Sequence, residues 1–213
     1  MFKSIQWKTF PRDFIRIEIG FALYGISIAL MIHSNLGTGA WTVLDVALSQ
    51  LIGLTVGRMT MISGFAVLIA AVLMREKIGW GTLANILSIG LWLDLFRLYI
   101  PNVHGNLPVQ ALMLLTSIFL MGNASAIYIG VNAGAGPRDS LMLAIHRVTS
   151  VSVRVARTAI EVTVVIIGWI LGGPAGMGTA VFSLLIGPAV QWGFKIFKVK
   201  PHQKIEAESV AVS

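Results

Sequence analysis

Two glycine-rich turns, 97 residues apart, constrain the fold of this chain more than any other feature of its sequence. The first is Gly37-Thr38-Gly39 and the second is Gly134-Ala135-Gly136. Each turn follows an apolar run long enough to cross a bilayer and precedes a segment that is too short to cross one. Two glycines free the backbone for a sharp turn, and Pro137 fits the first turn of a following helix. The pattern predicts that the chain consists of two copies of one structural unit.

Other positions follow the same offset. Six glycine pairs coincide, more than random placement of the glycines in the two halves would give. An asparagine pair and a threonine pair coincide as well. The matching pairs are Gly25 and Gly122, Gly37 and Gly134, Gly39 and Gly136, Gly79 and Gly176, Gly81 and Gly178, Gly90 and Gly187, Asn35 and Asn132, and Thr82 and Thr179.

The composition indicates an integral membrane protein. The chain is 56% hydrophobic and 12% charged, whereas soluble domains carry about 25% charged residues. The absence of cysteine excludes disulfides, thiol nucleophiles and thiolate metal sites. The net charge of +7 comes from short basic runs between apolar segments. This placement is typical of membrane orientation and argues against nucleic-acid binding.

The segments predict an all-α membrane protein with six principal transmembrane helices and two short re-entrant half-helices. The six spans are expected at 14–34, 59–74, 79–100, 109–131, 153–171 and 178–197, and the half-helices at 40–52 and 137–148. The resulting organisation is a cytoplasmic N-terminus (1–13), a first membrane repeat (14–100), an external connector (101–108), a second membrane repeat (109–197) and a disordered cytoplasmic tail (198–213).

Three spans in each half make the two repeats inverted relative to each other. With both termini in the cytoplasm, fourteen Lys and Arg residues fall inside and only Arg58 and Arg97 fall outside. In a rival arrangement the short segments also cross, which gives eight spans and parallel repeats. Its count is thirteen against three, so charge alone does not choose. Crossing by 137–148 would bury several charged side chains at about 2.5–3.5 kcal/mol each. The inverted arrangement is therefore preferred.

Four stretches resemble the YczE/YyaS/YitT group of bacterial membrane proteins. They are the Gly134-to-Asp139 motif, Arg157 to Glu161, the Gly-Gly-x-x-Gly-x-Gly-Thr run at 172–179 and Ile186-Gly187-Pro188. The resemblance covers roughly residues 15–195 and implies a multi-pass protein of the bacterial cytoplasmic (inner) membrane, without implying a particular biochemical activity. The first half has Ala40-Trp41 where the second has Pro137-Arg138, so an asymmetric site is expected.

The start of the second half-helix is the main candidate site. Exposed N–H groups at a helix start favour an anion. Arg138 adds a guanidinium suited to a carboxylate or phosphate. Asp139 lies where the helix dipole favours a negative charge. The alternative is that the half-helices are structural plugs and that Arg138 extends to the cytoplasmic interface.

A second set of charges lies in the fifth span. Arg154, Arg157 and Glu161 share one helix face, and Glu161 lies within an apolar run. Glu161 is placed to pair with Arg157, to contact Arg138 or to carry a coupling proton; the alternative is a static ion pair. We expect one charged cluster of Arg138, Asp139, Arg157 and Glu161 facing Gly37 to Trp41. The complete set of candidate binding residues is Arg138, Asp139, Arg157, Glu161, Gly134, Gly136, Gly37, Gly39, Trp41, Asn35 and Asn132.

These features predict a secondary transporter or channel for a small solute, an anion included. The competing prediction is a scaffold or accessory protein of the membrane that transports nothing. The sequence contains no motif typical of a hydrolase or a nucleotide-binding enzyme, and its four histidines show no ligand spacing. We therefore expect no enzymatic activity, no metal and no cofactor. The expected partners are the lipid bilayer and a small molecule or ion, without nucleic acid; a homo-oligomer stays an open alternative.

Overall fold

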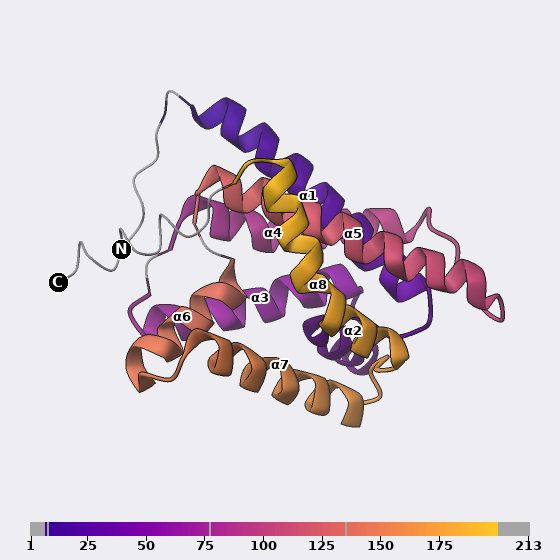
Figure 1. Ribbon diagram of the computed structural model, residues 1–213. Helices are drawn as coiled ribbons and strands as arrows, with labels where there is room; N and C mark the ends of the chain where they lie inside the picture. The colour runs from indigo at the N-terminus through magenta and orange to yellow at the C-terminus, as the bar shows by residue number, and fades with distance from the viewer. Residues whose placement is uncertain (1–6, 8, 77, 135, 200–213) are drawn as a thin grey trace.

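The computed structural model describes residues 7, 9–76, 78–134 and 136–199, and this part of the chain folds into eight α-helices (Figure 1). The predicted all-α fold is confirmed. The helices are α1 (Phe10–His33), α2 (Ala40–Ile52), α3 (Val56–Leu73), α4 (Trp80–Arg97), α5 (Leu107–Val131), α6 (Pro137–Thr149), α7 (Val153–Ile170) and α8 (Met177–Ile196).

The helix ends follow local sequence signals that recur in both halves. The Thr55 side chain caps α3 by accepting a hydrogen bond from Arg58 N, and the Ser152 side chain caps α7 by accepting one from Val155 N, both at 3.3 Å. The two short helices, α2 and α6, each have 13 residues and end at a residue in the left-handed conformation. Both features repeat at the 97-residue offset.

Two segment boundaries differ from the sequence-based expectation. Helix α1 begins at Phe10, inside the segment expected to be an N-terminal extension, and Pro11 lies in its first turn. Helix α5 begins at Leu107 rather than 109, because the side chain of Asn106 caps it and accepts from Val109 N. Most of the predicted C-terminal tail, from residue 200 onward, lies outside the described residues.

The long helices run in two opposite directions. The Phe10 and Trp80 rings lie 5.0 Å apart, and His33 Nδ1 lies 2.6 Å from the Ile100 oxygen, so α1 and α4 run parallel. Helix α5 runs against them, because its start bonds to the end of α1: Gln110 Nε2 donates to Ser34 O at 2.8 Å. Figure 1 shows the α4–α5 connector and the α7–α8 turn at one end of the bundle and the α6–α7 turn at the other.

The glycine-rich turns of the two halves pack against each other's helix starts. Gly37 has φ +115°, and a Cβ there would lie 2.8 Å from the Gly176 nitrogen. Gly134 has φ +133°, and a Cβ there would lie 2.8 Å from the Gly79 Cα. These two contacts are counterparts at the 97-residue offset. Only glycine combines this backbone conformation with so close an approach.

Backbone hydrogen bonds join the halves at the same places. Gly81 N donates to Ala133 O at 3.0 Å, and Gly178 N donates to Leu36 O at 2.7 Å. Donors and acceptors again correspond at the offset of 97. Each turn therefore satisfies a free N–H group at the start of a long helix in the other half.

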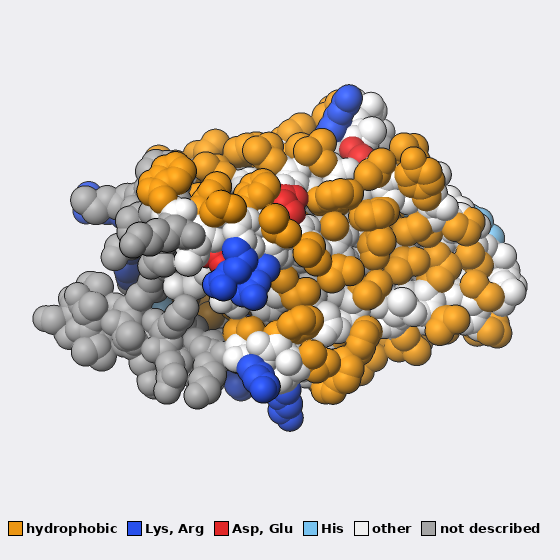
Figure 2. Space-filling model, turned by 90° about the horizontal axis from the view of Figure 1, so that it is seen from above, with side chains coloured by type: hydrophobic (Ala, Val, Ile, Leu, Met, Phe, Trp, Pro, Cys, Tyr) orange, Lys and Arg blue, Asp and Glu red, His pale blue; other side chains and the backbone are white. Residues whose placement is uncertain are grey.

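The outer surface is apolar. Figure 2 shows a face dominated by hydrophobic side chains with few charges. Four helices are long and apolar enough to cross a membrane, namely α1, α3, α5 and α8. The helices α4 and α7, two of the six predicted spans, are also 18 residues long but do not reach the same combination of hydropathy and low charge. Helix α7 carries the three charges of Arg154, Arg157 and Glu161.

The two halves differ in how their last helices pack. A Cβ at Gly90 on α4 would lie 2.6 Å from the Gly57 carbonyl oxygen of α3. Its counterpart, Gly187 on α8, would have nothing within 4 Å. Arg154 replaces the small Gly57 in the second half. Helices α3 and α4 are thus in close contact through glycines, while the same face of α8 is open.

This difference predicts opposite outcomes for two equivalent substitutions. We expect Gly90→Ala to lower the free energy of unfolding by about 1–3 kcal/mol, because the added methyl group overpacks the α3–α4 contact. Gly187→Ala should be close to neutral, since the methyl group meets open space and alanine favours a helix by up to about 1 kcal/mol. Thermal unfolding of the purified protein in detergent measures both. Equal losses in the two variants would contradict this packing.

Candidate functional site

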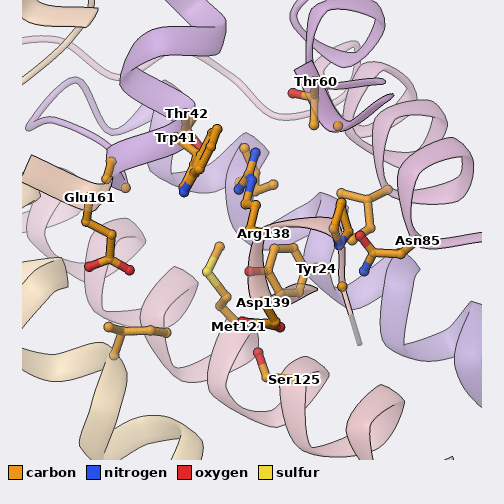
Figure 3. A pocket seen from close by; sticks show the side chains of 18 of the residues that line it. Tyr24, Trp41, Thr42, Thr60, Asn85, Met121, Ser125, Arg138, Asp139 and Glu161 are labelled. Carbon is orange, nitrogen blue, oxygen red and sulfur yellow. The ribbon is translucent and has the colours of Figure 1, made fainter. Parts of the chain in front are cut away.

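A cavity of about 200 Å³ lies at the centre of the helix bundle and is lined by side chains from all eight helices (Figure 3). Every lining residue of the first half has its counterpart, 97 positions later, in the lining as well. The pairs are Tyr24 and Met121, Ile28 and Ser125, Gly39 and Gly136, Ala40 and Pro137, Trp41 and Arg138, Thr42 and Asp139, Thr60 and Arg157, Gly64 and Glu161, Asn85 and Phe182, Ile86 and Ser183, and Ile89 and Ile186.

The charges in this lining come only from the second half. Four of the pairs set a neutral residue against a charged one: Trp41 with Arg138, Thr42 with Asp139, Thr60 with Arg157, and Gly64 with Glu161. The backbone frame of the cavity is therefore repeated, while its chemistry is asymmetric.

Arg138 connects the two halves through an ion pair. Its Nη2 lies 3.2 Å from Asp45 Oδ2, and the Asp45 side chain is only 1% exposed. Asp45 projects from the short helix α2, and Arg138 projects from the short helix α6. The pair thus joins the two half-helices directly, in surroundings where an unpaired charge would be costly.

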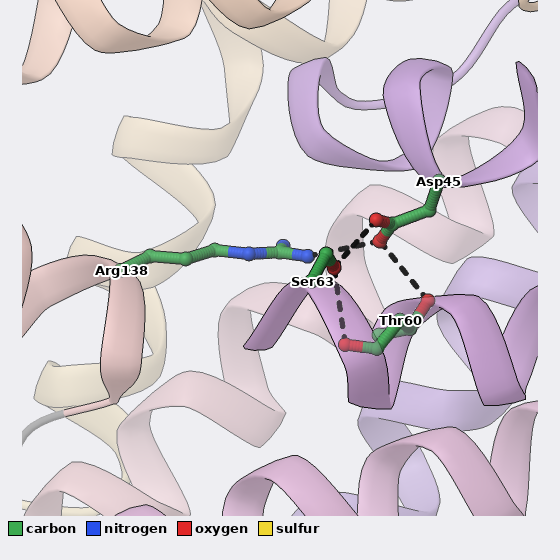
Figure 4. Close-up of polar contacts among 4 residues, drawn as sticks. All are labelled: Asp45, Thr60, Ser63 and Arg138. Atoms are coloured by element: carbon green, nitrogen blue, oxygen red, sulfur yellow. Dashed lines mark hydrogen bonds and ion pairs between the residues drawn. The ribbon is translucent and has the colours of Figure 1, made fainter. Parts of the chain in front are cut away.

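Two hydroxyl groups of α3 complete the surroundings of Asp45 (Figure 4). Thr60 Oγ1 donates to Asp45 Oδ2 at 3.0 Å, and Ser63 Oγ donates to Asp45 Oδ1 at 2.6 Å. Both carboxylate oxygens are therefore hydrogen-bonded. These hydrogen bonds to both oxygens offset the free-energy cost of burying a carboxylate in an apolar bundle.

Trp41 holds the other side of the guanidinium. The Arg138 Cζ atom lies 4.9 Å from the centroid of the Trp41 ring. Trp41 and Asp45 are one helical turn apart on α2, so one face of this helix offers Arg138 both a ring and a carboxylate.

The remaining charges of the cavity lining lie on α6 and α7. Arg157 Nε donates to Glu161 Oε1 at 2.9 Å, one turn away on α7. The hydroxyl of Tyr128 donates to Asp139 Oδ2 at 3.3 Å, so this carboxylate has a hydroxyl as its neighbour. With Asp45, the site contains two guanidinium groups and three carboxylates.

The predicted binding residues fall into two groups. Those that line the cavity are Arg138, Asp139, Arg157, Glu161, Gly136, Gly39 and Trp41. Those that do not are Gly37, Gly134, Asn35 and Asn132. The two glycines pack on the opposite half, as described above. Asn35 Nδ2 donates to His33 O and Val103 O, and Asn132 ends α5 with φ 60°. The asparagines therefore serve backbone geometry.

The predicted charged cluster divides into pairs. Arg138 is in contact with Asp45, and Arg157 is in contact with Glu161, so no ion pair joins Arg138 to Glu161 among the described residues. Asp45 is not among the residues predicted to form the site. A lone carboxylate within the apolar segment Ala40–Ile52 was the signal that could have identified it, because such a residue needs a partner inside the protein.

In the described part of the chain, no group of three or more His, Asp or Glu side chains is placed to hold a metal ion. The chemistry that the site offers is hydrogen bonding, ion pairing and contact with aromatic rings.

An apolar exterior around a polar, charge-lined cavity defines a helical membrane protein. The chain belongs to a family of unknown function (DUF6198), which it matches over residues 12–195. The predicted resemblance to YczE and YyaS is confirmed by the sequence identity that each shares with this chain.

Three relatives match along most of the chain. An uncharacterized protein of Haemophilus influenzae is 32% identical over 182 residues, covering 85% of this chain and 83% of the relative. The uncharacterized membrane protein YczE of Bacillus subtilis is 31% identical, covering 79% of each chain. The uncharacterized protein YyaS of Bacillus subtilis is 30% identical, covering 79% of this chain and 86% of the relative. No solved structure matches the chain.

The ion pair between the half-helices predicts energetic coupling. We expect Asp45→Asn and Arg138→Gln each to lower thermal stability, because each leaves a buried charge without its partner. The double variant should cost less than the sum of the two, with a coupling of about 1–3 kcal/mol. The matched control is Asp45→Asn combined with Arg157→Gln, since Arg157 pairs with Glu161 instead. Additive losses in both combinations would contradict the assigned pairing.

Proposed function

We propose that this protein is a multi-pass protein of the cytoplasmic membrane that carries a small solute through the central cavity. Both termini lie in the cytoplasm. Six principal helices form two inverted three-helix repeats, and α2 and α6 are re-entrant half-helices. The protein acts as a secondary transporter or a channel and not as an enzyme.

The directions of equivalent helices support the inverted arrangement. Helices α1 and α5 are counterparts in the repeat and run in opposite directions, as their end contacts show. Helix α8 runs against its counterpart α4: its start bonds to Leu36 after α1, and Val199 beyond its end meets Gly130 near the end of α5. Helix α7 has the opposite direction to α3, because α7 begins just after the last turn of α6, where Arg147 donates to Met74 O at the end of α3. Transporters are frequently built from such pairs.

Two of the three charges of α7 face the cavity and so do not count against its crossing the membrane. Arg154 is the second residue of the helix, where a long basic side chain can extend to the interface. Arg157 and Glu161 line the cavity and pair with each other. Intramembrane charges characteristically face a bundle interior or a water-filled cavity. A cavity-facing helix of this kind is less apolar than a helix surrounded by lipid.

The observation that carries the proposal is the asymmetric charged lining of a cavity between two repeated halves. Arg138, Asp139, Arg157 and Glu161 line the cavity at positions whose first-half equivalents are neutral, and only Arg138 among them pairs with the other half. Transporters typically place the binding site near the midplane, at the interface of their repeats and beside the starts of short helices.

The Asp45–Arg138 pair is a contact that would change if the two halves moved relative to each other. It joins α2 of one half to α6 of the other, and the second half also lacks the tight glycine contact of α3 and α4. Rocking of the halves would alter this pair and would open the cavity alternately to the two sides of the membrane.

The second candidate is a membrane scaffold or accessory protein. Helix α8 favours it, because α8 is the least buried of the four apolar spans and has an open glycine face that a partner helix could contact. In that case the cavity would be a sealed internal defect.

Single cysteines distinguish these functions, and the natural chain adds no background because it has no cysteine. Ser125 lines the cavity, whereas Ser117 is fully buried between helices outside it. We expect Ser125→Cys in membrane vesicles to react with a small, water-soluble methanethiosulfonate reagent, because the cavity is hydrated and opens to at least one side. Ser117→Cys should stay unmodified under the same conditions.

The degree of labelling is read by mass spectrometry. Absence of modification at Ser125→Cys from either side of the membrane would show a sealed interior and would favour the scaffold. Modification of both cysteines to the same extent would indicate an open or unfolded bundle and would contradict the proposed cavity.

A further inference from the structure

We propose that the central cavity binds a solute that carries an ammonium group, with Asp139 as its counter-ion. This inference rests on the proposed function, because it names the chemical class that the same cavity accepts. It differs from the prediction of an anion, which relied on the guanidinium of Arg138.

The first argument is the pairing of charges. Asp45 lies 3.2 Å from Arg138, and Glu161 lies 2.9 Å from Arg157. Both guanidinium groups of the site are therefore already engaged by carboxylates. Among the described residues, Asp139 forms no ion pair, and its contact is the Tyr128 hydroxyl at 3.3 Å. With three carboxylates and two guanidinium groups, the site has one carboxylate in excess, and Asp139 is the one without an ion pair in the described part of the chain.

The second argument is the position of Asp139 at the start of a helix. Asp139 is the third residue of α6, whose N-cap is Gly136. The N–H groups and the dipole at a helix start stabilise a carboxylate. They supply partial charges only, so a full positive charge is still favoured beside it.

The third argument is the aromatic wall. The rings of Tyr24 and Tyr128 meet edge to face, with their centroids 6.5 Å apart, and both residues line the cavity. Figure 3 shows Tyr24 and Asp139 on the same cavity wall. Ammonium groups are attracted to the faces of such rings. A carboxylate beside aromatic rings is therefore a combination that suits a cation better than an anion.

An anion would meet a less favourable site. An anion beside Arg138 would share the guanidinium charge with Asp45, which lies 3.2 Å from Nη2, and would be close to a second negative charge. Drawing Arg138 away from Asp45 would leave a buried carboxylate without its cation, which is strongly unfavourable. An ammonium group requires no such exchange, because it completes the pairing that the protein leaves open.

The test compares matched probes on the purified full-length protein in lipid nanodiscs. Choline and ethanolamine supply a cation, glycine betaine supplies a zwitterion, and the carbon isosteres of choline and betaine supply a neutral molecule and an anion of the same shapes. Calorimetric titration and the shift of the unfolding temperature report binding. We expect at least one of the ammonium probes to bind and both carbon isosteres to fail. Comparison of choline with betaine then shows whether the site takes a cation or a zwitterion.

Asp139→Asn keeps the shape of the side chain and removes its charge. It should weaken binding of the ammonium probe about tenfold or more, the effect of losing a charge-assisted contact. The control is Glu18→Gln. Glu18 also accepts hydrogen bonds, from Ser88 and Trp92, but it lies outside the cavity lining. This variant should bind the probe as the natural protein does.

Loss of folding in Asp139→Asn would be visible as a lowered unfolding temperature without probe. In that event Tyr128→Phe replaces it: this variant keeps the ring, frees the carboxylate from its hydroxyl neighbour and should bind the ammonium probe at least as tightly as the natural protein. Weaker binding in Tyr128→Phe would overturn the inference.

Two other results overturn the inference. One is binding of the anionic or neutral isostere at least as tightly as its ammonium counterpart, which would leave the proposed solute cavity in place. The other is failure of all ammonium probes to bind. Labelling of the cavity cysteine, described above, decides separately whether the proposed function fails with it.

Discussion

Backbone hydrogen bonds between the two halves position the helices that surround the central cavity. Gly81 N bonds to Ala133 O, and Gly178 N bonds to Leu36 O, so the turn after the first helix of each half caps the last helix of the other. Inside an apolar bundle such groups need hydrogen-bond partners from the protein itself. The glycines of the turns permit the close approach, and the two short helices that follow are thereby directed to the centre of the bundle, where α2 and α6 meet across the Asp45–Arg138 pair.

The same hydrogen bonds explain why a cavity forms and why it is polar. Two equivalent short helices end the apolar packing near the centre, and the equivalent positions around them line one space. Equivalent positions of the two repeats form the backbone around the cavity, and the charged side chains of its lining come from the second half. The first half contributes the counter-ion of one of these charges, because Asp45 of α2 pairs with Arg138 of α6. A site that depends on both halves is well suited to respond to their relative movement.

Much of the fold could be predicted from the sequence, and less of the site. The helices lie within a few residues of the predicted segments, because apolar runs and glycine turns are local signals. Arg138, Asp139, Arg157 and Glu161 do line one cavity, but their pairing depends on packing between distant segments. Asp45 is 93 residues from Arg138, and no local pattern connects the two. Asn35 and Asn132 do not line the cavity, and their left-handed backbone conformations place them in the turns that precede the short helices.

The central claim is that two inverted repeats enclose this cavity within the membrane. A cryo-electron microscopy structure in lipid nanodiscs, with an antibody fragment to aid alignment, tests it most directly because the density of the bilayer gives the orientation of the repeats. Residues 15–96 should superpose on residues 112–193 by a rotation of about 180° around an axis in the membrane plane, with α2 and α6 at the level of the hydrocarbon core. Superposition about the membrane normal, with both short helices crossing the bilayer, would contradict this claim.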